Sequence, residues 1–357
     1  MLNKKNIFKN KKILITGHTG FKGSWLSLWM YKLEANILGI SKDVPTNPSH
    51  YKSVGLDKLV KNKFIDIQDL NKLKKTIKVF KPDFIFHLAA QAIVKKSYKD
   101  SLLTWKTNLI GTINILESLK EIKKKTYVIL ITSDKVYKNL ETKRGYKEND
   151  FLGGIDPYGA SKSATELAIQ SYIKSFFSGR KNKIYISVGR AGNVIGGGDW
   201  SENRLIPDCM KSLKKNTKMY VRNPSSTRPW QHVLEVLNGY IILAKKLKKN
   251  KKLHGEVFNF GPKNKNYKVI EVLQKIKFFW HDINWKIIKK KNFFENNLLN
   301  LDSSKAEKIL KWRCKLNFNK TIQITTDWYK NFFNYKNNKR KIFIKSIEQI
   351  NDFENLR

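Results

Sequence analysis

The first half of the chain alternates short apolar runs with amphipathic stretches, and this alternation constrains its fold more than any other feature. Short β-branched runs are typical of buried strands, whereas apolar residues that recur at helical spacing are typical of helices packed on a sheet. Repeated strand–helix–strand units form parallel sheets with right-handed crossovers. The pattern therefore predicts an α/β fold with a Rossmann-type doubly wound parallel sheet, whose ligands lie at the carboxyl ends of the strands.

The expected elements can be placed along the chain. Expected strands cover residues 12–16, 36–40, 63–65, 84–88, 127–132, 185–190 and 257–260, and expected helices cover 25–32, 70–80, 103–120, 161–175 and 232–248. After about residue 193 the alternation breaks, and glycines and prolines mark loops. We expect a dinucleotide-binding domain over 1–192, to which 229–262 return, and a smaller C-terminal α+β substrate-binding domain over 193–228 and 263–335. Residues 336–357 are expected to be a charged tail, either an appended helix or a loosely held extension.

Lysine and arginine number 71 against 29 aspartates and glutamates, which gives a formal net charge of +42. Such an excess is typical of proteins that bind nucleic acid. Here, however, lysine is spread along the whole chain, and there is no basic arm and no zinc-ligand spacing. We therefore expect neither a nucleic-acid nor a membrane partner, and interpret the charge as a solvent-facing bias that also attracts an anionic small substrate.

The two cysteines, Cys209 and Cys314, are too few for a disulfide framework, which favours a reducing compartment. No apolar run approaches the roughly 18 residues of a membrane span, and the N-terminal residues lack the apolar core of a signal peptide. The six histidines are scattered, without a second ligand at metal spacing, so no metal is predicted. These features favour a cytoplasmic protein.

The segment ILITGHTGFKGSWL places Gly17, Gly20 and Gly23 between the first expected strand and the first expected helix. Glycines at this point allow a tight turn and let backbone N–H groups reach a pyrophosphate at the positive end of the helix. The sequence therefore predicts a dinucleotide site here. The spacing GxxGxxG, in place of GxGxxG, resembles that of short-chain dehydrogenases.

Two later strand ends are further candidates for cofactor contact. Asp66 and Ile67 follow the third strand, where a carboxylate could accept a hydrogen bond from the adenine amino group. The segment HLAAQ ends the fourth strand with small residues that permit close approach of a cofactor, which places Leu88, Ala89 and Ala90 in the predicted site.

The end of the second strand bears on the choice between NAD and NADP. Ser41, Lys42 and Asp43 compete for the position that usually holds the adenosine ribose. Asp43 lies where a ribose-binding acid is expected, whereas Lys42 could favour a 2′-phosphate. The alternative stays open at this point, and we favour NAD.

The segment LITSDKVYK ends a buried strand in a hydroxyl, a carboxylate and an amine, from Ser133, Asp134 and Lys135. Further on, Tyr158 and Lys162 of YGASK lie four residues apart at the start of a helix and so share one face. Tyrosine has an unperturbed pKa of about 10. We expect a nearby ammonium and a positively charged nicotinamide to lower the pKa of Tyr158, which would let it exchange protons near neutral pH.

From about residue 11 to about residue 261 the chain resembles the extended short-chain dehydrogenases/reductases that act on sugar nucleotides, the NAD-dependent epimerase/dehydratase family. Within that family it is most similar to the 4,6-dehydratases whose substrate is CDP-glucose. The motifs that carry the resemblance are TGHTGFKGSWL, FHLAAQAIVKKSY, TNLIGT, TSDKVY, YGASKSATEL, GRAGNVIGGGDW, RLIPD and RPWQHVLE.

The resemblance implies a dehydration that returns its hydride to the sugar. Tyr158, assisted by Lys162 and Ser133, takes the proton of the glucose 4-hydroxyl while hydride passes from C4 to bound NAD. Lys135 then removes the C5 proton and Asp134 protonates the departing C6 hydroxyl, a step that an epimerase does not need. A lysine can act as this base only if its pKa is depressed.

The resemblance also assigns supporting residues. Phe21 joins the three glycines at the cofactor, and Asn108 supports the active-site helix and a proton relay, although a purely structural role for Asn108 stays open. The diphosphate requires arginines with bidentate forks. The expected substrate contacts are Asn193, Arg204, Arg222, Arg228 and Asn259.

A lyase of this kind would supply deoxysugars for surface polysaccharide such as lipopolysaccharide O-antigen, and the helices at 103–120 and 161–175 would form the interface of a homodimer or homotetramer. Two alternatives stay open. One is another nucleotide-sugar 4,6-dehydratase or a 4-epimerase of the same family. The other is a nucleic-acid-binding protein built on an inactive dehydrogenase fold.

Overall fold

A computed structural model describes residues 6–142, 144–179, 181–262, 266–288, 299–335 and 338–356. The strands are β1 (Lys12–Thr16), β2 (Asn36–Ser41), β3 (Lys61–Phe64), β4 (Phe84–His87), β5 (Thr126–Ile131), β6 (Ile184–Ala191), β7 (Val194–Ile195), β8 (Met219–Val221), β9 (Thr227–Arg228), β10 (Gln231–His232), β11 (Val257–Phe260), β12 (Tyr267–Lys268) and β13 (Trp285–Ile287). The α-helices are α1 (Phe21–Lys32), α2 (His50–Ser53), α3 (Leu56–Leu59), α4 (Leu70–Phe80), α5 (Val94–Lys99), α6 (Ser101–Trp105), α7 (Gly111–Lys120), α8 (Pro157–Phe176), α9 (Leu205–Lys214), α10 (Val233–Lys249), α11 (Val269–Phe279), α12 (Phe318–Asn334) and α13 (Lys339–Asn355). Four shorter turns are η1 (Lys106–Ile110), η2 (Asp134–Val136), η3 (Lys251–Leu253) and η4 (Ala306–Leu310).

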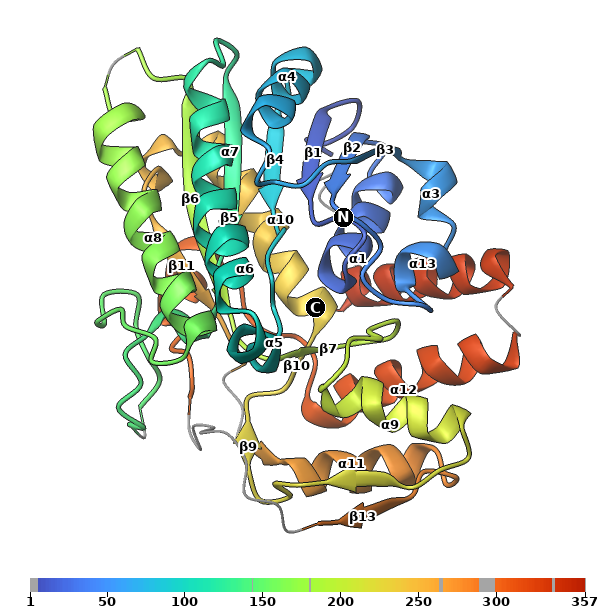
Figure 1. Cartoon of the computed structure of the whole chain (residues 1–357). Helices are drawn as coiled ribbons and strands as arrows, with labels where there is room; N and C mark the ends of the chain where they lie inside the picture. Colours follow the sequence, from blue (N-terminus) through green and yellow to red (C-terminus); the bar gives the residue numbers. More distant parts are fainter. Residues whose placement is uncertain are drawn as a thin grey trace.

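The centre of the molecule is a seven-stranded sheet in the order β11-β6-β5-β4-β1-β2-β3, and every neighbouring pair is parallel. The strand order reverses between β1 and β4, which is the point where doubly wound sheets bind their ligands. Figure 1 shows the sheet between two groups of helices. The predicted fold class, a Rossmann-type doubly wound sheet, is confirmed.

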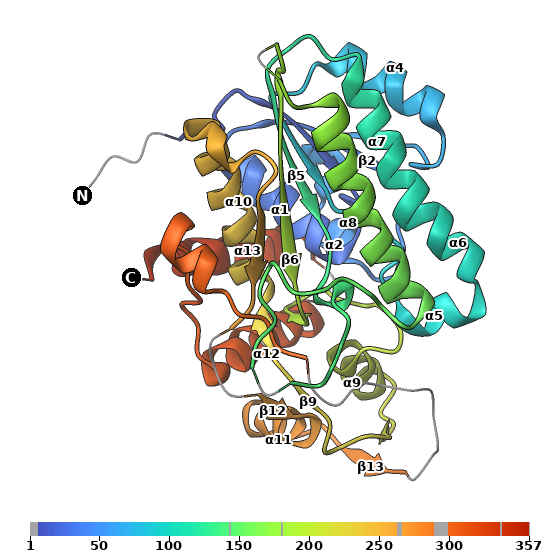
Figure 2. The same ribbon diagram turned by 90° about the vertical axis from the view of Figure 1, so that its left-hand side faces the viewer.

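Each face of the sheet has its own hydrophobic core. Ile13 and Ile15 of β1 point to the face covered by α1 and α10, whereas Leu14 between them points to the face covered by α4, α7 and α8. Successive side chains of a strand point to opposite faces, so the continuous apolar runs predicted as strands are buried on both sides. Figure 2 shows the two helical layers on either side of the sheet.

The predicted strands and helices lie where the sequence placed them, with differences at their ends. The helix expected over 103–120 is three segments, α6, the π-helical η1 and α7. The helix expected from residue 161 begins at Pro157, because the Asp156 side chain accepts hydrogen bonds from the backbone N–H groups of Tyr158 and Gly159. A side chain that satisfies free N–H groups in this way fixes where a helix starts.

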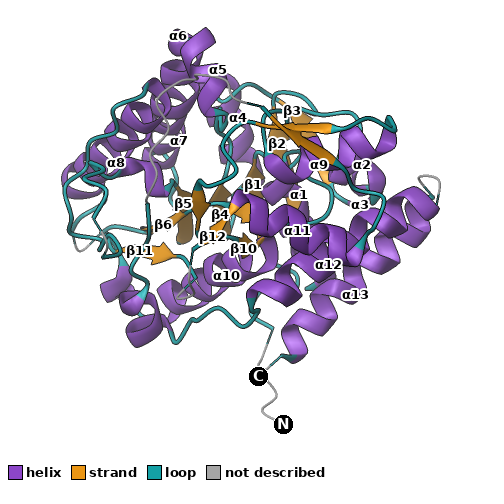
Figure 3. Cartoon of the chain, turned by 90° about the horizontal axis from the view of Figure 1, so that it is seen from below, coloured by secondary structure: helices purple, strands orange, loops and turns teal. Residues whose placement is uncertain are grey.

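The part of the chain after β6 builds a smaller layer at the carboxyl ends of the central strands. It contains α9, α11 and α12 with three two-stranded sheets, which pair β7 with β10, β8 with β13 and β9 with β12. Figure 3 views the molecule from this side. β11 returns to the central sheet beside β6. The ends of β5 and β6 therefore face this smaller layer.

The C-terminal segment forms α13, which packs firmly against α1 and α2. Its residues Ile342, Ile350 and Phe353 are buried in the larger core, and Trp29 of α1 donates a hydrogen bond of 2.7 Å to Glu354. Of the two alternatives for the tail, the structure has the appended helix. Across the part of the chain that the structure describes, no helix has the length and hydropathy needed to cross a membrane.

Candidate active site

The strand tip that follows β5 brings together a hydroxyl and a carboxylate inside the protein. The Ser133 hydroxyl donates a hydrogen bond of 2.9 Å to Asp134 Oδ1 and accepts one of 3.2 Å from the Lys135 backbone N–H. Only 6% of Asp134 is exposed, whereas Lys135 is half-buried. The carboxylate that ends this strand is therefore inside the protein, and the lysine beside it is partly exposed.

The environment of Asp134 favours its protonated form. Burial raises the pKa of this carboxyl, while Lys135, the Ser133 hydrogen bond, Lys22 and Arg228 act in the opposite direction. The net direction is upward because removal of a carboxylate from water is costly. A carboxyl that keeps its proton can act as a general acid.

Gly192, just after β6, makes room for the Asp134 carboxyl. A Cβ atom at Gly192 would lie 2.9 Å from Asp134 Oδ2, closer than real side-chain contacts allow. A glycine is therefore required at this position for the acid to occupy its place beside β6.

Tyr158 and Lys162 lie in the first two turns of α8, and both are buried. The Tyr158 phenol lies close enough to Ser133 and Asp134 for both to affect its pKa, which places the start of α8 beside the strand tip. Burial raises the pKa of Tyr158 to about 12, and the Ser133 hydroxyl opposes this rise. The expected lowering of this pKa depends on a positively charged nicotinamide beside the phenol and stays a prediction.

Lys162 is affected by its surroundings in the opposite sense. Burial and the nearby Lys22 ammonium lower its pKa to about 8, while Glu166 one turn further along α8 raises it. The same burial that makes Tyr158 hold its proton makes Lys162 release one more easily. The two groups are thus further apart in proton affinity than free tyrosine and lysine side chains, whose pKa values are nearly equal.

Asn108 lies in the π-helical turn η1 and is buried. Its Oδ1 accepts a hydrogen bond of 2.8 Å from the Gln91 backbone N–H, and its Nδ2 donates one of 2.9 Å to Ser161 Oγ. Ser161 Oγ in turn donates to the Tyr158 carbonyl at 2.7 Å. π-helical turns inside helices are frequent at functional sites. Asn108 therefore bonds both backbone and the active-site helix, which combines its two expected roles.

The glycine-rich turn forms a cradle that larger residues would fill. Gly17 has a φ of +74°, and a Cβ there would lie 2.7 Å from the Ala89 backbone nitrogen. A Cβ on Gly23 would collide with the Gly17 carbonyl at 2.0 Å. α1 begins at Phe21 after Gly20, which gives no side-chain cap. The N–H groups of its first turn are thus available for phosphate oxygens, which fits a dinucleotide.

Near this cradle, the backbone after β4 approaches from the neighbouring strand. The Ala89 N–H donates a hydrogen bond of 3.2 Å to the Thr16 hydroxyl. Leu88, Ala89 and Ala90 are all half-buried, so their backbone borders the turn at Gly17 without filling it.

At the adenosine end, Lys42 Nζ lies 3.1 Å from Asp66 Oδ2. Ser41 is turned inward, where its hydroxyl contacts His18 Nδ1 at 2.8 Å, while Asp43 is exposed. Because Lys42 is paired with a carboxylate, its charge is partly neutralised, which weakens the case for a 2′-phosphate. The Ile67 side chain packs against Gly111 in the core, so only its backbone could reach a cofactor.

The residues expected to bind substrate fall into two groups. Arg204 forms an ion pair of 2.9 Å with Asp199, and Arg228 is close enough to lower the pKa of Asp134. Asn193 is half-buried between β6 and β7, at the rim of the same site. Arg222, by contrast, is exposed after β8, and its charge acts on Asp208. The structure therefore brings Asn193, Arg204 and Arg228 to the site and leaves Arg222 outside the group around Asp134.

The structure does not support the expected contact between Asn259 and the substrate phosphate. Its side chain is 0% exposed; its Oδ1 accepts from the Tyr137 hydroxyl at 2.8 Å, and its Nδ2 donates to the Tyr146 carbonyl at 2.8 Å. The resemblance suggested a phosphate contact, but no surface of this amide faces the site. The reason is long-range packing, because the segment that contains Tyr146 covers the end of β11.

Lys22 is a residue of the site that the sequence interpretation missed. It lies in the first turn of α1, and its half-buried ammonium feels the charges of Arg204, Asp134 and Asp199. Burial lowers its pKa to about 8. A signal was present in GFKG, because a cation in the first turn of a helix is unfavourable and so calls for an anionic neighbour.

The residues that the structure describes contain no group of three or more histidine, cysteine, aspartate or glutamate side chains that could hold a metal ion. Both cysteines are free thiols. The side chains at this site offer a phenol, amines, a carboxyl and a hydroxyl for chemistry.

Comparison with known proteins decides the family. The family model for GDP-mannose 4,6 dehydratase matches residues 14–325. The chain belongs to this family. It is 41% identical over 331 residues to the CDP-glucose 4,6-dehydratase of Salmonella typhimurium, covering 91% of this chain and 92% of that protein.

Solved structures agree on the fold. The epimerase Mth375 of Methanothermobacter thermautotrophicus superimposes with a TM-score of 0.80 at 20% identity, over 92% of this chain and 95% of that one. The dTDP-glucose 4,6-dehydratase of Bacillus anthracis in complex with NAD gives a TM-score of 0.74 at 22% identity, over 90% of this chain and 96% of that one. The predicted recognition of this family from its motifs is confirmed.

Proposed function

We propose that this chain is a hydro-lyase that converts CDP-D-glucose to CDP-4-dehydro-6-deoxy-D-glucose and water. The observation that carries the proposal is the buried Asp134 carboxyl beside Ser133 and Tyr158, because an acid at this point serves the loss of water and has no use in simple epimerisation. The 41% identity to a CDP-glucose 4,6-dehydratase over almost the whole chain supports the same substrate.

The cofactor supported by the site is NAD. The glycine cradle at Gly17 and Gly23, the uncapped N-terminus of α1 and the Lys42–Asp66 pair fit a dinucleotide without a 2′-phosphate. When bound, NAD supplies the acceptor for the C4 hydride and returns that hydride to C6, so the reaction has no net redox change. We propose that it stays bound between turnovers.

We assign the first step, the oxidation at C4, to Tyr158 on α8 and Ser133 at the strand tip. Tyr158 accepts the proton of the glucose 4-hydroxyl, and the Ser133 hydroxyl near the phenol holds that hydroxyl in line. Because burial raises the pKa of Tyr158 to about 12, the step requires positive charge next to the phenol. The Lys162 ammonium and the nicotinium ring supply this charge.

We assign the second step, the loss of water, to Lys135 and Asp134 at the strand tip. The 4-ketone makes the C5 proton acidic, and we propose Lys135 as the base that takes it. The Asp134 carboxyl gives its proton to the departing C6 oxygen, which leaves as water. When C6 receives the hydride, Lys135 returns a proton to C5, and the proton taken up by Tyr158 passes to Asp134, which resets both groups. Half-burial of Lys135 beside Asp134 supports a role inside the site rather than in solvent.

The substrate diphosphate is assigned to the cationic side of the site. Arg204, held by Asp199, and Arg228 present guanidinium groups next to the acid, and Asn193 lies at the rim. Guanidinium forks bind phosphate oxygens in pairs. Arg222 stays a weaker candidate because it is exposed and acts on Asp208.

Several wider properties are proposed with this function. Exposed apolar side chains on α6, η1 and α8, namely Leu102, Ile110, Leu167 and Phe176, support a homodimer or homotetramer formed through these helices. The free thiols support a cytoplasmic enzyme. The nucleotide sugar named for its CDP-glucose 4,6-dehydratase relative supports a role in deoxysugar synthesis for surface polysaccharide, including lipopolysaccharide O-antigen.

The test is incubation of purified protein and NAD with CDP-glucose, followed by detection of a 4-keto-6-deoxy product and of deuterium from solvent at C5. Parallel reactions with dTDP-, GDP- and UDP-glucose determine the preferred nucleotide. A 4-epimerised sugar without loss of water would make the chain an epimerase. Salt-sensitive binding of a DNA duplex, with no turnover of any sugar nucleotide, would favour the nucleic-acid-binding alternative.

A further inference from the structure

The turn that carries Asp134 is held weakly by its own backbone. In η2 the Val136 N–H reaches the Ser133 carbonyl at 3.4 Å, and the Tyr137 N–H reaches the Asp134 carbonyl at 3.4 Å. Both distances are at the long end for N–H···O hydrogen bonds. A turn of three residues with such bonds needs other contacts to keep the acid in one place.

These contacts lead to a buried ion pair between α8 and β6. Arg190 Nε donates a hydrogen bond of 2.7 Å to Glu166 Oε1, a second bond joins Arg190 Nη2 to Glu166 Oε2, and both side chains are 1% exposed. A bidentate pair of this kind is geometrically specific. Glu166 lies one turn after Lys162 on α8. The ion pair is therefore attached to the helix that carries Tyr158 and Lys162.

The ion pair forms hydrogen bonds with residues on both sides of the Asp134 turn. Just before the turn, the Thr132 hydroxyl donates a hydrogen bond of 2.5 Å to Glu166 Oε1. Just after it, the Tyr137 hydroxyl accepts one of 2.7 Å from Arg190 Nη1, and the Arg190 guanidinium lies 4.7 Å from the Tyr137 ring centroid. We call this set of four residues the Glu166–Arg190 bracket.

The Tyr137 arm of the bracket is also tied on its far side. Its hydroxyl donates a hydrogen bond of 2.8 Å to Asn259 Oδ1 on β11, and its side chain is only 2% exposed. Its ring stacks on Tyr146 at 5.1 Å between centroids. The Tyr137 hydroxyl therefore both donates and accepts a hydrogen bond, and its ring contacts Arg190 and Tyr146.

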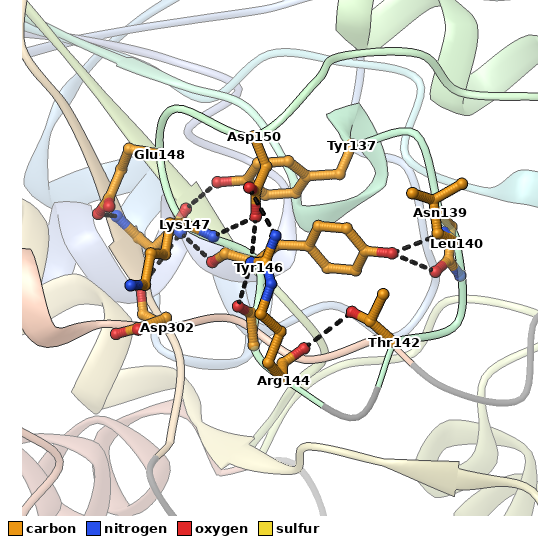
Figure 4. Close-up of polar contacts among 12 residues, drawn as sticks. Tyr137, Asn139, Leu140, Thr142, Arg144, Tyr146, Lys147, Glu148, Asp150 and Asp302 are labelled. Carbon is orange, nitrogen blue, oxygen red and sulfur yellow. Dashed lines mark hydrogen bonds and ion pairs between the residues drawn. The ribbon is translucent and has the colours of Figure 1, made fainter.

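The loop after the turn extends this support. In Figure 4, Tyr146 donates to Asn139, and Arg144 forms a paired contact with Asp150 at 2.6 Å and 2.8 Å. The backbone of Tyr146 pairs with residues near Asp302, whose N–H donates to the Tyr146 carbonyl at 2.9 Å. These contacts hold Tyr146 where its ring packs against the Tyr137 ring.

We propose that the Glu166–Arg190 bracket positions Asp134 against the Tyr158 helix, and that its Tyr137 arm serves the loss of water rather than the first hydride transfer. This inference rests on the proposed function, because it assigns Asp134 to elimination. Tyr137 is a positioning residue. Its phenol does not face the acid, and it acts by fixing the far end of the turn in which Asp134 lies.

The two steps should respond differently because they use differently supported groups. Ser133 lies two residues after the end of β5 and Tyr158 is part of α8, so the first hydride transfer depends on groups at regular elements that do not need Tyr137. Asp134 depends on the turn between Ser133 and Tyr137. A displacement of the order of 1 Å at a reacting group can reduce a rate by about a hundredfold.

The experiment uses Tyr137→Phe, which keeps the buried ring and removes only the hydroxyl. The matched control is Tyr240→Phe, because Tyr240 on α10 is also buried and its hydroxyl has no partner within the described residues. Each enzyme with NAD is mixed rapidly with CDP-glucose, and the absorbance of reduced nicotinamide and the appearance of the 4-keto-6-deoxy product are followed in the same sample.

For Tyr137→Phe we expect reduced nicotinamide to form within about twofold of the wild-type rate, while product formation slows by about tenfold or more, so that reduced nicotinamide accumulates. Tyr240→Phe should change neither rate. Should Tyr137→Phe fail to fold, Asn259→Ala removes the acceptor of the same hydroxyl and should shift the two rates in the same direction.

Equal slowing of both steps in a folded variant, or no change in either, would overturn the inference. Circular dichroism and gel filtration establish the folded state, so a loss of structure is not mistaken for such a result. If the wild-type chain itself released no dehydrated product from any sugar nucleotide, the proposed function would be wrong and the inference would fall with it. An active wild type with an unselective Tyr137→Phe variant removes the inference alone.

Discussion

Glu235, in the first turn of α10, is a buried carboxyl whose replacement should make the protein more stable at high pH. Its Oε1 accepts hydrogen bonds from the backbone N–H groups of Lys315 and Leu316 at 2.7 Å and 2.6 Å. Its Oε2 has no partner among the described residues, and the side chain is almost inaccessible. Burial raises its pKa from 4.5 to about 7, and the two backbone hydrogen bonds oppose this rise.

The sign of the pH effect follows from this direction. The folded state holds the proton more tightly than the unfolded state, so the stabilising contribution is complete below about pH 4.5 and is lost as pH rises to about 7. Each tenfold change in proton affinity corresponds to about 1.4 kcal/mol, which makes the full cost of ionised Glu235 about 3 kcal/mol. Glu235→Gln keeps the acceptor oxygen and cannot ionise.

The assay is urea unfolding followed by tryptophan fluorescence at pH 5 and pH 8. We expect Glu235→Gln to exceed wild type by about 3 kcal/mol at pH 8 and by about 1 kcal/mol or less at pH 5. The control, Glu348→Gln, alters an exposed carboxylate on α13 and should change stability by no more than about 0.5 kcal/mol at either pH. The same difference at both pH values, or a less stable Glu235→Gln variant at pH 8, would refute the reasoning.

Three predictions concern the active site. Asp134→Asn should still reduce the cofactor but lose product formation by a factor of about 10²–10⁴, measured by rapid mixing; unimpaired dehydration would remove Asp134 from the mechanism. Tyr158→Phe should abolish reduction of the cofactor, and normal turnover in that variant would contradict the first step. Gly192→Ala places a Cβ 2.9 Å from Asp134 Oδ2 and should slow elimination while NAD affinity, measured by fluorescence titration, is unchanged; an equal loss of NAD affinity would show that Gly192 acts elsewhere.

The sheet could be predicted from the sequence because its strands, except the exposed edge strand β3, are short apolar runs buried on both faces. Each of them is a local signal, as in residues 127–131, and the parallel order follows from the helices between them. The strand tip was predictable for the same reason, since Ser133 and Asp134 follow such a run without an intervening turn. Tyr158 and Lys162 share a helix face, which a spacing of four residues is enough to indicate.

The errors have a common physical origin, since each concerns an environment made by distant segments. Asn259 was expected to contact phosphate, but Tyr137 and Tyr146, more than a hundred positions earlier, enclose its amide. Burial of a polar group is decided by tertiary packing, which local pattern does not record. Lys22 was missed because its anionic neighbours, Asp134 and Asp199, come from other elements.

The charges around Asp134 link substrate binding to the protonation of its carboxyl. Burial raises the pKa of this carboxyl although Lys135, Lys22 and Arg228 all lower it. Arg228 is also a proposed ligand of the substrate diphosphate, whose negative charge would offset the guanidinium. With that lowering influence reduced and burial unchanged, the pKa of Asp134 can only move further upward. The acid is therefore most fully protonated when a nucleotide sugar is in place, which is when its proton is needed by the departing hydroxyl.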